Sequence, residues 1–596
     1  MDTAAQEGLA APWRAVPRAA TITAVNSPKP PRSANALWTV AAVVATAASA
    51  LTVGGAFTPY LRVFALSGDD FGIVLRSSAQ YVSPAQMLQW FTKGYLGYWD
   101  NYPGWAPTGT AFVRPLLNFM VYAQGSLAGV LGDRAFMIAD YAAVFATVCL
   151  LVVLLRRYTD LAPLPAGVLA AAVGLSPIWY LSLLFPIMGT TALPFCVGAL
   201  VVLDPGRQGP GWQRLMGCSI LLTLAVAIHE TSLVAVPICI AVLYGYAPKM
   251  PSRRELLWFA IPVAFFGIER VLLDAFQGAA KASITPSNIY ALGLGGGLVA
   301  PLKHLLVGPL VPYDSMRFLY QRMEGLSAQY AAVWAMAIVA NIVVFAAITS
   351  GLRGESPRRL KVALVSALAM ALFFPLLMNA DPRIMGLSFV LALVAAIALN
   401  PGRRRLQWLV VAAVLAANIG LFALVLSTEV PGHIRAAKFS SAYADYLRRS
   451  IAQSDRKQII LVNDPVGATG ARAMLQIAAW PRTDLDFIVV NSYDGACYSN
   501  MGLVPNPSLE GAKASSVAIL GNRLHVTTRY SDHQILLFGG NTPDYNVSTS
   551  GFRYSGIEPT GSAGGTLDAS GPVLPGDSLI VGVDPTTGTM LGPLLP

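Results

Sequence analysis

Long apolar stretches alternate with short polar segments through the first two thirds of the chain. A helix needs about 20 apolar residues to cross the hydrocarbon layer of a bilayer. Measured against that length, the pattern predicts eleven membrane-spanning helices within residues 37–429. They are expected near residues 37–59, 135–155, 163–180, 188–203, 215–229, 231–247, 256–274, 328–350, 362–378, 384–400 and 406–427.

Two of the connections between these helices are long and rich in aromatic residues. They cover residues 60–134 and 275–329. Loops longer than about 12–15 residues in a compact fold are usually functional or disordered, and the aromatic content favours function. Inside the first loop, the apolar stretch from Pro115 to Gly132 is interpreted as a helix or helical hairpin at the outer membrane interface.

Lys and Arg residues gather between the apolar stretches, and cytoplasmic loops of membrane proteins carry such an excess. With a cytoplasmic N-terminus, every short basic cluster falls on the cytoplasmic side, while the opposite connections 181–187 and 229–230 contain no Lys or Arg. Counting Pro115–Gly132 as a further crossing would break this alternation. The clustered residues are Arg14, Arg18, Lys29, Arg32, Arg156, Arg157, Arg207, Arg214, Lys249, Arg253, Arg254, Arg353, Arg358, Arg359, Lys361, Arg403, Arg404 and Arg405.

The composition indicates a membrane protein, which we expect to be a multi-pass protein of a bacterial inner (plasma) membrane. Of the 596 residues, 55% are hydrophobic and 12% are charged, whereas soluble domains contain about 25% charged residues. The net charge of +10 resides in the clusters between apolar stretches, so it indicates membrane orientation and no nucleic-acid partner. Residues 1–36 are expected to form a disordered cytoplasmic tail. The five Cys residues show neither a disulfide framework nor a metal-type spacing.

The chain becomes polar and mixed in composition after Ser427. Residues 430–596 are therefore expected to form a separate domain of α/β or β-rich type. Eleven crossings from a cytoplasmic N-terminus place this domain on the periplasmic, extracytoplasmic side. The predicted helices are 436–454 and 468–480, and the predicted strands are 457–462, 486–491, 516–520, 524–528, 534–538 and 578–583.

An acidic pair, Asp69-Asp70, follows the first apolar stretch directly and begins the longest loop of the membrane part. One interpretation is a helix cap, in which a carboxylate accepts free N–H groups of a helix that starts near Phe71. The other is a general base, or an anchor for an acceptor hydroxyl or a metal ion. Adjacent side chains diverge, so we expect only one of the two to face a site.

Other polar residues lie at the same ends of the predicted helices. Arg114 either snorkels to the headgroups, with Pro115 starting a helix, or meets a phosphate. His229 and Glu230 form either a polar turn or a polar pair beside the substrate, because charge within the hydrocarbon is expensive. Arg383 lies in a short outer turn, where its planar fork suits a phosphate. An ion pair within that turn is the alternative.

These motifs together resemble the integral-membrane glycosyltransferases of the GT-C superfamily. The acidic pair stands in a large outer loop that ends in Phe-x-Arg-Pro-Leu, from Phe112 to Leu116. The Ile228-His229-Glu230 segment is similar to a Lys/His-Glu segment of that superfamily. Asp381-Pro382-Arg383 occupies the place of an Arg-Tyr motif, although no Tyr follows Arg383 here. The resemblance covers residues 37–427.

The resemblance implies an enzyme that takes a sugar from a polyprenyl-phosphate carrier and passes it to an envelope glycan, lipid or protein acceptor, with inversion. It implies Asp69 as the catalytic base, with Asp70 as the next candidate, and Arg383 as a phosphate ligand. Some members hold a divalent metal with acids from two loops, but residues 181–187 contain no acid, which does not favour a metal here. Further substrate-binding candidates are Arg114, Lys303, His304, His229 and Glu230.

Two other classes of function remain open. A polytopic transporter or flippase would carry charged or broken helices near the middle of the bilayer and an internal repeat, and the sequence shows neither. A non-catalytic subunit of envelope assembly would need no catalytic acid at all.

Overall fold

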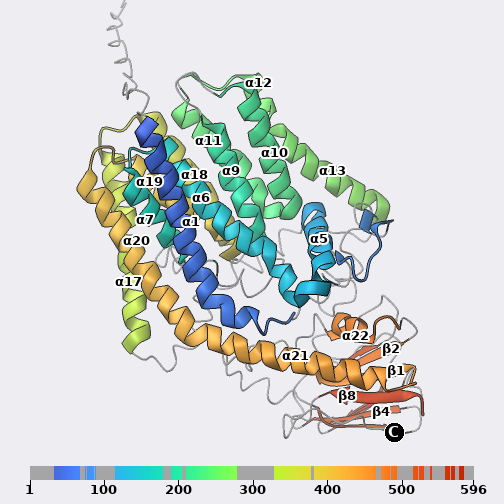
Figure 1. Ribbon diagram of the computed structural model, residues 1–596. Helices are drawn as coiled ribbons and strands as arrows, with labels where there is room; N and C mark the ends of the chain where they lie inside the picture. The colour runs from blue at the N-terminus through green and yellow to red at the C-terminus, as the bar shows by residue number, and fades with distance from the viewer. Residues whose placement is uncertain are drawn as a thin grey trace, which may run out of the picture.

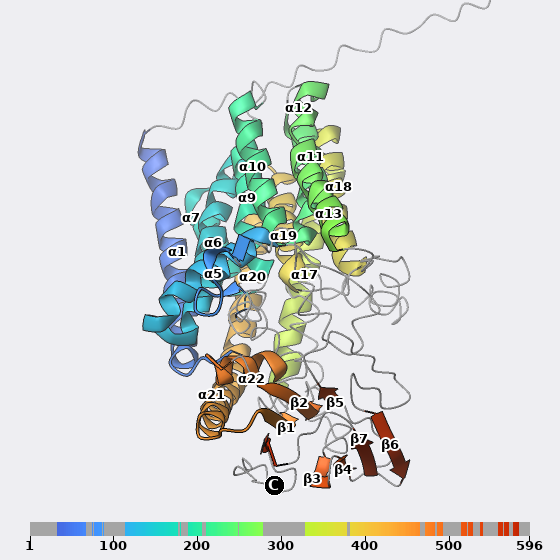
Figure 2. The same cartoon turned by 90° about the vertical axis from the view of Figure 1, so that its right-hand side faces the viewer.

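The computed structural model consists of a helical bundle and a smaller α/β unit, which the long helix α21 (Val430–Ala452) joins (Figure 1). Figure 2 shows the bundle from a second side, with the α/β unit below it. The structure describes residues 32–66, 74, 77–85, 87–88, 114–176, 179, 189–204, 210–247, 249–277, 328–377, 382–464, 471–482, 485–492, 514–520, 523–528, 537–539, 558–563, 566–570 and 576–582.

A helix lies at each of the eleven predicted crossings. Four apolar helical stretches among the described residues are long enough to span a bilayer by themselves, and the number of crossings stays a prediction. The four stretches are Asn35–Leu61, Pro115–Tyr158, Ala335–Arg353 and Arg404–Ser427. The helices are α1 (Arg32–Leu61), α6 (Ile138–Tyr158), α7 (Pro163–Gly174), α9 (Leu193–Leu203), α10 (Trp212–Ile228), α11 (Ala235–Tyr246), α13 (Ala260–Gln277), α17 (Ala328–Arg353), α18 (Arg358–Leu377), α19 (Pro382–Ala398) and α20 (Arg404–Leu424).

The predicted basic clusters meet at one end of the bundle, which we call the basic end. Hydrogen bonds and ion pairs there join residues from connections far apart in the sequence. They link Arg156 to Asn35, Arg157 and Arg214 to Asp204, Arg359 to the carbonyl of Tyr244, and Arg403 to Ser350. The helices therefore alternate in direction as the charge pattern predicts. Which end faces the cytoplasm stays a prediction.

The opposite end of the bundle, called here the α21 end, carries the first long connection and the α/β unit. Helix α5 (Pro115–Leu131) lies beside the lower half of the bundle in Figures 1 and 2 and does not reach the upper end. A φ of 65° at Gly132 ends α5 and leads into the 3₁₀-helix η2 (Gly132–Met137). Glycine suits this left-handed conformation because it has no Cβ. The predicted helix Pro115–Gly132 is thus present.

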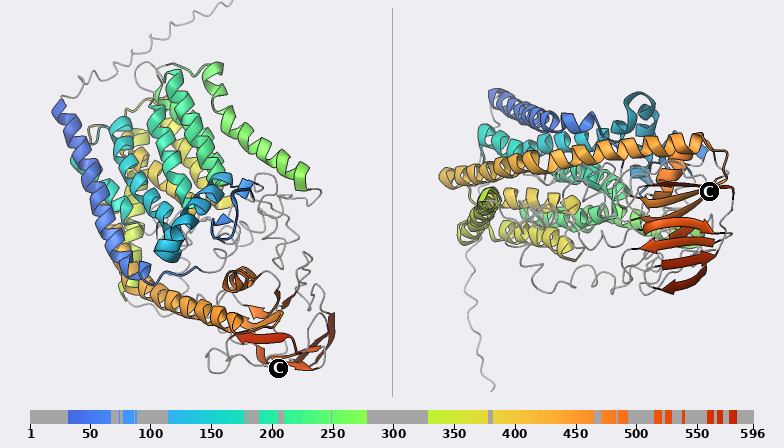
Figure 3. Two further views of the ribbon diagram at one scale, coloured as in Figure 1. Left: turned by 45° about the vertical axis from the view of Figure 1, so that its right-hand side comes forward. Right: turned by 90° about the horizontal axis from the view of Figure 1, so that it is seen from below.

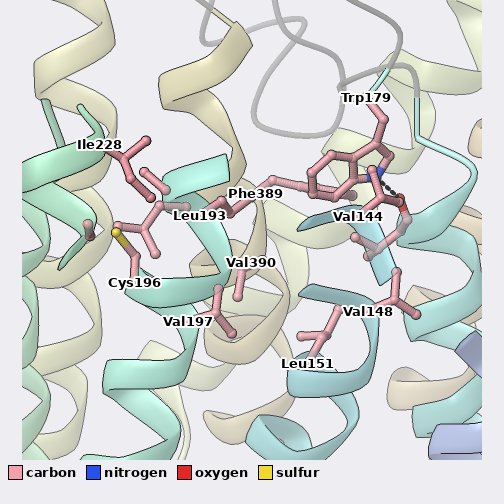
Figure 4. Packing of buried hydrophobic residues seen from close by; sticks show 14 of the residues in the cluster. Val144, Val148, Leu151, Trp179, Leu193, Cys196, Val197, Ile228, Phe389 and Val390 are labelled. Atoms are coloured by element: carbon pink, nitrogen blue, oxygen red, sulfur yellow. Dashed lines mark hydrogen bonds between the residues drawn. The ribbon is translucent and has the colours of Figure 1, made fainter. Parts of the chain in front are cut away.

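The bundle core is packed mainly from Ala, Val and Leu side chains (Figure 4). Trp179 is fully buried and its Nε1 donates a hydrogen bond of 2.7 Å to the carbonyl of Val173, as Figure 4 shows. A Cβ built on Gly245 of α11 would lie 2.3 Å from the Cβ of Ala363 on α18, so glycine allows these helices to approach closely. Core residues drawn there include Val144, Val148, Leu151, Leu193, Cys196, Val197, Ile228, Phe389 and Val390.

The described residues of the α/β unit form two four-stranded sheets. In the first, ordered β5-β2-β1-β8, strands β2 and β8 both pair parallel to β1, and β5 is antiparallel to β2. In the second, ordered β3-β4-β7-β6, all neighbours are antiparallel. The elements are β1 (Gln458–Asp464), α22 (Ala471–Ala479), β2 (Asp486–Ser492), β3 (Ala514–Leu520), β4 (Arg523–Thr528), β5 (Leu537–Gly539), β6 (Glu558–Ala563), β7 (Thr566–Ser570) and β8 (Ser578–Gly582).

Direct contacts attach the α/β unit to the membrane part. The ring of Tyr81, from the first long connection, meets the ring of Trp480 edge to face, with centroids 5.5 Å apart. The hydroxyl of Tyr446 on α21 accepts a hydrogen bond of 3.2 Å from the backbone N–H of Gly582. Helix α21 runs along the end of the bundle towards the sheets, as Figure 3 shows.

Candidate functional site

Arg114 and Glu230 form a bidentate ion pair at the α21 end. Arg114 Nε lies 3.0 Å from Glu230 Oε2, and Arg114 Nη2 lies 3.0 Å from Glu230 Oε1. Both side chains are largely buried, with 18% and 16% of their surface exposed. Two parallel N–H···O bonds match the planar guanidinium fork to both carboxylate oxygens, so the pair fixes the relative orientation of the two segments.

Local sequence explains how the two partners are presented. Arg114 occupies the N-cap position of α5, and Pro115 follows at the first helical position, where its missing N–H costs nothing. Helix α10 ends at His229, whose backbone is extended, and the short 3₁₀-helix η5 (Glu230–Val234) begins there. The His229 Nδ1 lies 2.7 Å from the Thr231 hydroxyl and accepts from the Thr231 N–H at 3.4 Å. The imidazole thereby caps the turn that carries Glu230.

The electrostatics of the pair keep Glu230 ionised. Glu230 is the first residue of η5, in the connection between α10 and α11. Burial by itself raises the pKa of the Glu230 carboxyl, but the Arg114 guanidinium and the His229 ring outweigh burial and hold that pKa well below its ordinary value. A charged carboxylate with its counter-charge in hydrogen-bond contact is the stable form of such a buried group. The geometry therefore favours a positioning role for Arg114 and Glu230, in which the guanidinium of Arg114 binds both carboxylate oxygens of Glu230.

The first long connection packs closely on α5. The hydroxyl of Ser77 lies 3.5 Å from Asn118 Oδ1, one turn after Arg114. A Cβ on Gly125 would lie 2.2 Å from Ser78 Oγ and 2.9 Å from the backbone N of Ala79, so only glycine allows this approach. The connection and the Arg114–Glu230 pair therefore both fix α5.

Of the other predicted site residues named here, the structure describes the position of Arg383 alone. Asp69, Asp70, Lys303 and His304 lie outside the residues that the structure describes. The backbone of Arg383 lies in the first turn of α19. Helix α19 ends at the basic end, where Leu399 accepts a hydrogen bond from Ser356, so α19 begins towards the α21 end. Arg383 thus shares that end of the bundle with Arg114 and Glu230.

Several buried polar residues at this end were not predicted from the sequence. Asp140, in the first turn of α6, is 1% exposed. Asn118 and Gln124 on α5 are also buried, and Gln124 Nε2 donates a bond of 3.2 Å to the carbonyl of Phe136. In the sequence, the signal that could have identified these residues was an isolated polar residue at the end of an apolar stretch. In the part of the chain that the structure describes, no three His, Cys, Asp or Glu side chains gather to hold a metal ion.

Comparison with known proteins gives structural likenesses only. No family model matches the chain, and no curated protein matches it by sequence. The chain is similar to the arabinofuranosyltransferase AftD from Mycobacteria, with 16% identity and a TM-score of 0.40, over 74% of this chain and 31% of that protein. It spans about a third of the length of AftD.

Two further solved structures show the same level of likeness. One is ArnT from Cupriavidus metallidurans bound to undecaprenyl phosphate, with 13% identity and a TM-score of 0.41, over 82% of this chain and 96% of ArnT. The other is the oligosaccharyltransferase AglB from Archaeoglobus fulgidus in complex with an inhibitory peptide and a dolichol-phosphate, with 12% identity and a TM-score of 0.38, over 85% of this chain and 76% of AglB.

Likeness at these identities and TM-scores does not indicate a substrate or a mechanism. The function is therefore inferred from the residues of this chain. By their names, AftD is an arabinofuranosyltransferase and AglB an oligosaccharyltransferase, and the ArnT and AglB structures contain a polyprenyl phosphate.

Proposed function

We propose that this chain is a membrane glycosyltransferase that moves a sugar from a polyprenyl-phosphate carrier to an envelope glycan, lipid or protein acceptor. The supporting observation is the different chemistry of the two bundle ends. Arg156, Arg214 and Arg359 form structural bonds at the basic end. The α21 end instead combines a locked Arg114–Glu230 pair with the start of α19.

In this proposal, the Arg114–Glu230 pair positions the first long connection for catalysis. The described residues that flank Asp69 and Asp70 in the chain are Leu66 and Val74, which are 3% and 2% exposed. A misplacement of a catalytic group by about 1 Å can cost about 100-fold in rate, so buried flanks are the support that the proposal requires for Asp69. The pair thus supports the catalytic acid without touching the substrate.

The reaction is a direct displacement at the anomeric carbon. The acceptor hydroxyl attacks that carbon and transfers its proton to the Asp69 carboxylate. The bond from the anomeric carbon to the carrier phosphate breaks, and the phosphate oxygen leaves with the electron pair. Attack opposite to the leaving group inverts the configuration. Arg383 neutralises the charge that develops on the phosphate, aided by the N–H groups at the start of α19.

The test uses the purified full chain in lipid nanodiscs. Labelled polyprenyl-phosphate sugars of several kinds are supplied together with an envelope extract from a deletion strain as the acceptor source. We expect label to move from the carrier into acceptor material. If no sugar leaves any carrier, while proteoliposomes move a lipid-linked sugar across the bilayer, the chain is a flippase and the proposal is wrong.

A further inference from the structure

A cavity of about 450 Å³ opens at the α21 end, away from the Arg114–Glu230 pair. Its walls come from the residues after α1, from the 3₁₀-helix η2 and from α21. Helix α5, with 17 residues, separates this cavity from Arg114, which corresponds to about 25 Å at 1.5 Å per residue. The polar residues that line it are Arg62, Asp133, Arg134, Lys438, Ser441 and Asp445.

The charges around this cavity are not balanced within the protein. Asp445 already pairs with Arg448, at 2.9 Å, and the Asp133 carboxylate accepts a backbone hydrogen bond from Leu66. Among the described residues, Arg62, Arg134 and Lys438 enter no ion pair. The cavity is lined by three cations and two acids, and one of these acids, Asp445, already has Arg448 as its counter-charge, so the lining carries net positive charge and favours an anion.

The position of Arg62 sets the depth of the cavity relative to a bilayer. Helix α1 has 30 residues and ends at Leu61, which gives it a length of about 45 Å. The hydrocarbon core measures about 30 Å, and the bilayer with its headgroups about 40–45 Å. An α1 centred in the bilayer therefore places Arg62 at the level of the lipid phosphates.

Exposed apolar side chains flank the same cavity along the chain. Val130 and Leu131 at the end of α5, and Ile138 at the start of α6, are 87%, 39% and 42% exposed. They immediately precede and follow η2, which supplies Asp133 and Arg134 to the cavity. An apolar border beside a cationic cavity suits an amphiphile, whose acyl chains cover the border while its headgroup enters.

We propose that this cavity binds the phosphate of an anionic phospholipid from the surrounding leaflet. Arg62, Arg134 and Lys438 form charge-assisted bonds to the phosphate oxygens, and Ser441 donates a further hydrogen bond. Bound lipid would tie α1, η2 and α21 together, and with them the α/β unit that α21 carries. This site is independent of the proposed transferase chemistry.

The test measures thermal unfolding of the delipidated full chain in detergent micelles. Phosphatidylglycerol, phosphatidylcholine and glycerol 3-phosphate are added separately. We expect phosphatidylglycerol to raise the midpoint and phosphatidylcholine to do so less. Glycerol 3-phosphate should have no comparable effect. An equal rise with glycerol 3-phosphate would identify a soluble phosphate ester as the ligand and overturn the lipid assignment.

Variants locate the effect in the protein. Arg134→Gln with Lys438→Gln should remove at least half of the shift that phosphatidylglycerol produces, whereas Lys438→Arg should retain it. Arg405→Gln removes an exposed cation at the basic end and serves as the matched control. If Arg134→Gln with Lys438→Gln responds to phosphatidylglycerol as the unmodified chain does, the cavity is not the site. Native mass spectrometry of the retained lipid gives a second readout should the double variant unfold early.

Discussion

Arg114 and Glu230 are 116 positions apart in the sequence and meet through two parallel hydrogen bonds of 3.0 Å. The pair joins the start of α5 to the turn between α10 and α11. It thus links the first long connection to the middle of the bundle.

Removing one partner should destabilise the protein strongly. Glu230→Gln leaves the Arg114 charge buried without its counter-charge, and we expect a loss of about 3–5 kcal/mol. Arg114→Lys keeps the charge but loses the fork, so its loss should be smaller. The free energy of unfolding in mixed detergent micelles measures both. Glu355→Gln, at an exposed position of the basic end, is the control and should stay within about 0.5 kcal/mol.

The contribution of Glu230 should depend on pH only in strong acid. A carboxyl whose folded-state pKa is lowered stabilises the protein fully above its unfolded-state pKa of about 4.3. That stabilisation is lost as the pH falls through the lowered folded-state value. Histidine side chains titrate in the same range, so the comparison is made in a His229→Asn background, where the difference in unfolding free energy between the chains with and without Glu230→Gln should be constant between about pH 8 and pH 5.5. A difference that disappears within this range would contradict the lowered pKa.

Gly125 and Gly129 offer a matched pair of substitutions on α5. Gly125→Ala would place a Cβ 2.2 Å from Ser78 Oγ and 2.9 Å from the Ala79 backbone N, and overpacking of this kind costs about 1–3 kcal/mol. Gly129→Ala meets nothing within 4 Å and gains up to about 1 kcal/mol in helix propensity. We expect only Gly125→Ala to lower both stability and sugar transfer. Equal effects of the two would show that the connection does not depend on this approach.

The acidic pair should divide into one essential and one less important residue. Positioned base catalysis contributes about 10²–10⁴-fold, so Asp69→Asn should reduce sugar transfer by that factor while leaving the midpoint of thermal unfolding unchanged. Asp70→Asn should have the smaller effect on transfer. Initial rates with a labelled polyprenyl-phosphate sugar measure both. Normal transfer by Asp69→Asn would remove this residue as the base.

The helices of the bundle were predictable because each depends on a local property of the sequence. An apolar stretch of about 20 residues has few alternatives to a helix in a bilayer, since its backbone groups must be satisfied internally. The same holds for Pro115–Leu131, where a proline starts the helix and a glycine ends it. By contrast, β6 and β7 lie in a stretch rich in Gly, Ser and Thr without apolar alternation, and they were not predicted. Strand β7 pairs with β4, and β6 pairs with β7, which holds both strands in the sheet.

The sequence by itself determined which segments are helical, that the basic residues share one end and that polar residues gather at helix ends. From the sequence, Arg114 and Glu230 were each candidate site residues, but as two independent features. Only the tertiary structure decided that they bind each other, because two polar residues 116 positions apart have many available partners. The close approach at Gly125 and the cavity of Arg62, Arg134 and Lys438 were likewise invisible in the sequence. Both arise where segments distant in the chain pack together. The local pattern of apolar and polar residues does not show which distant segments will be neighbours.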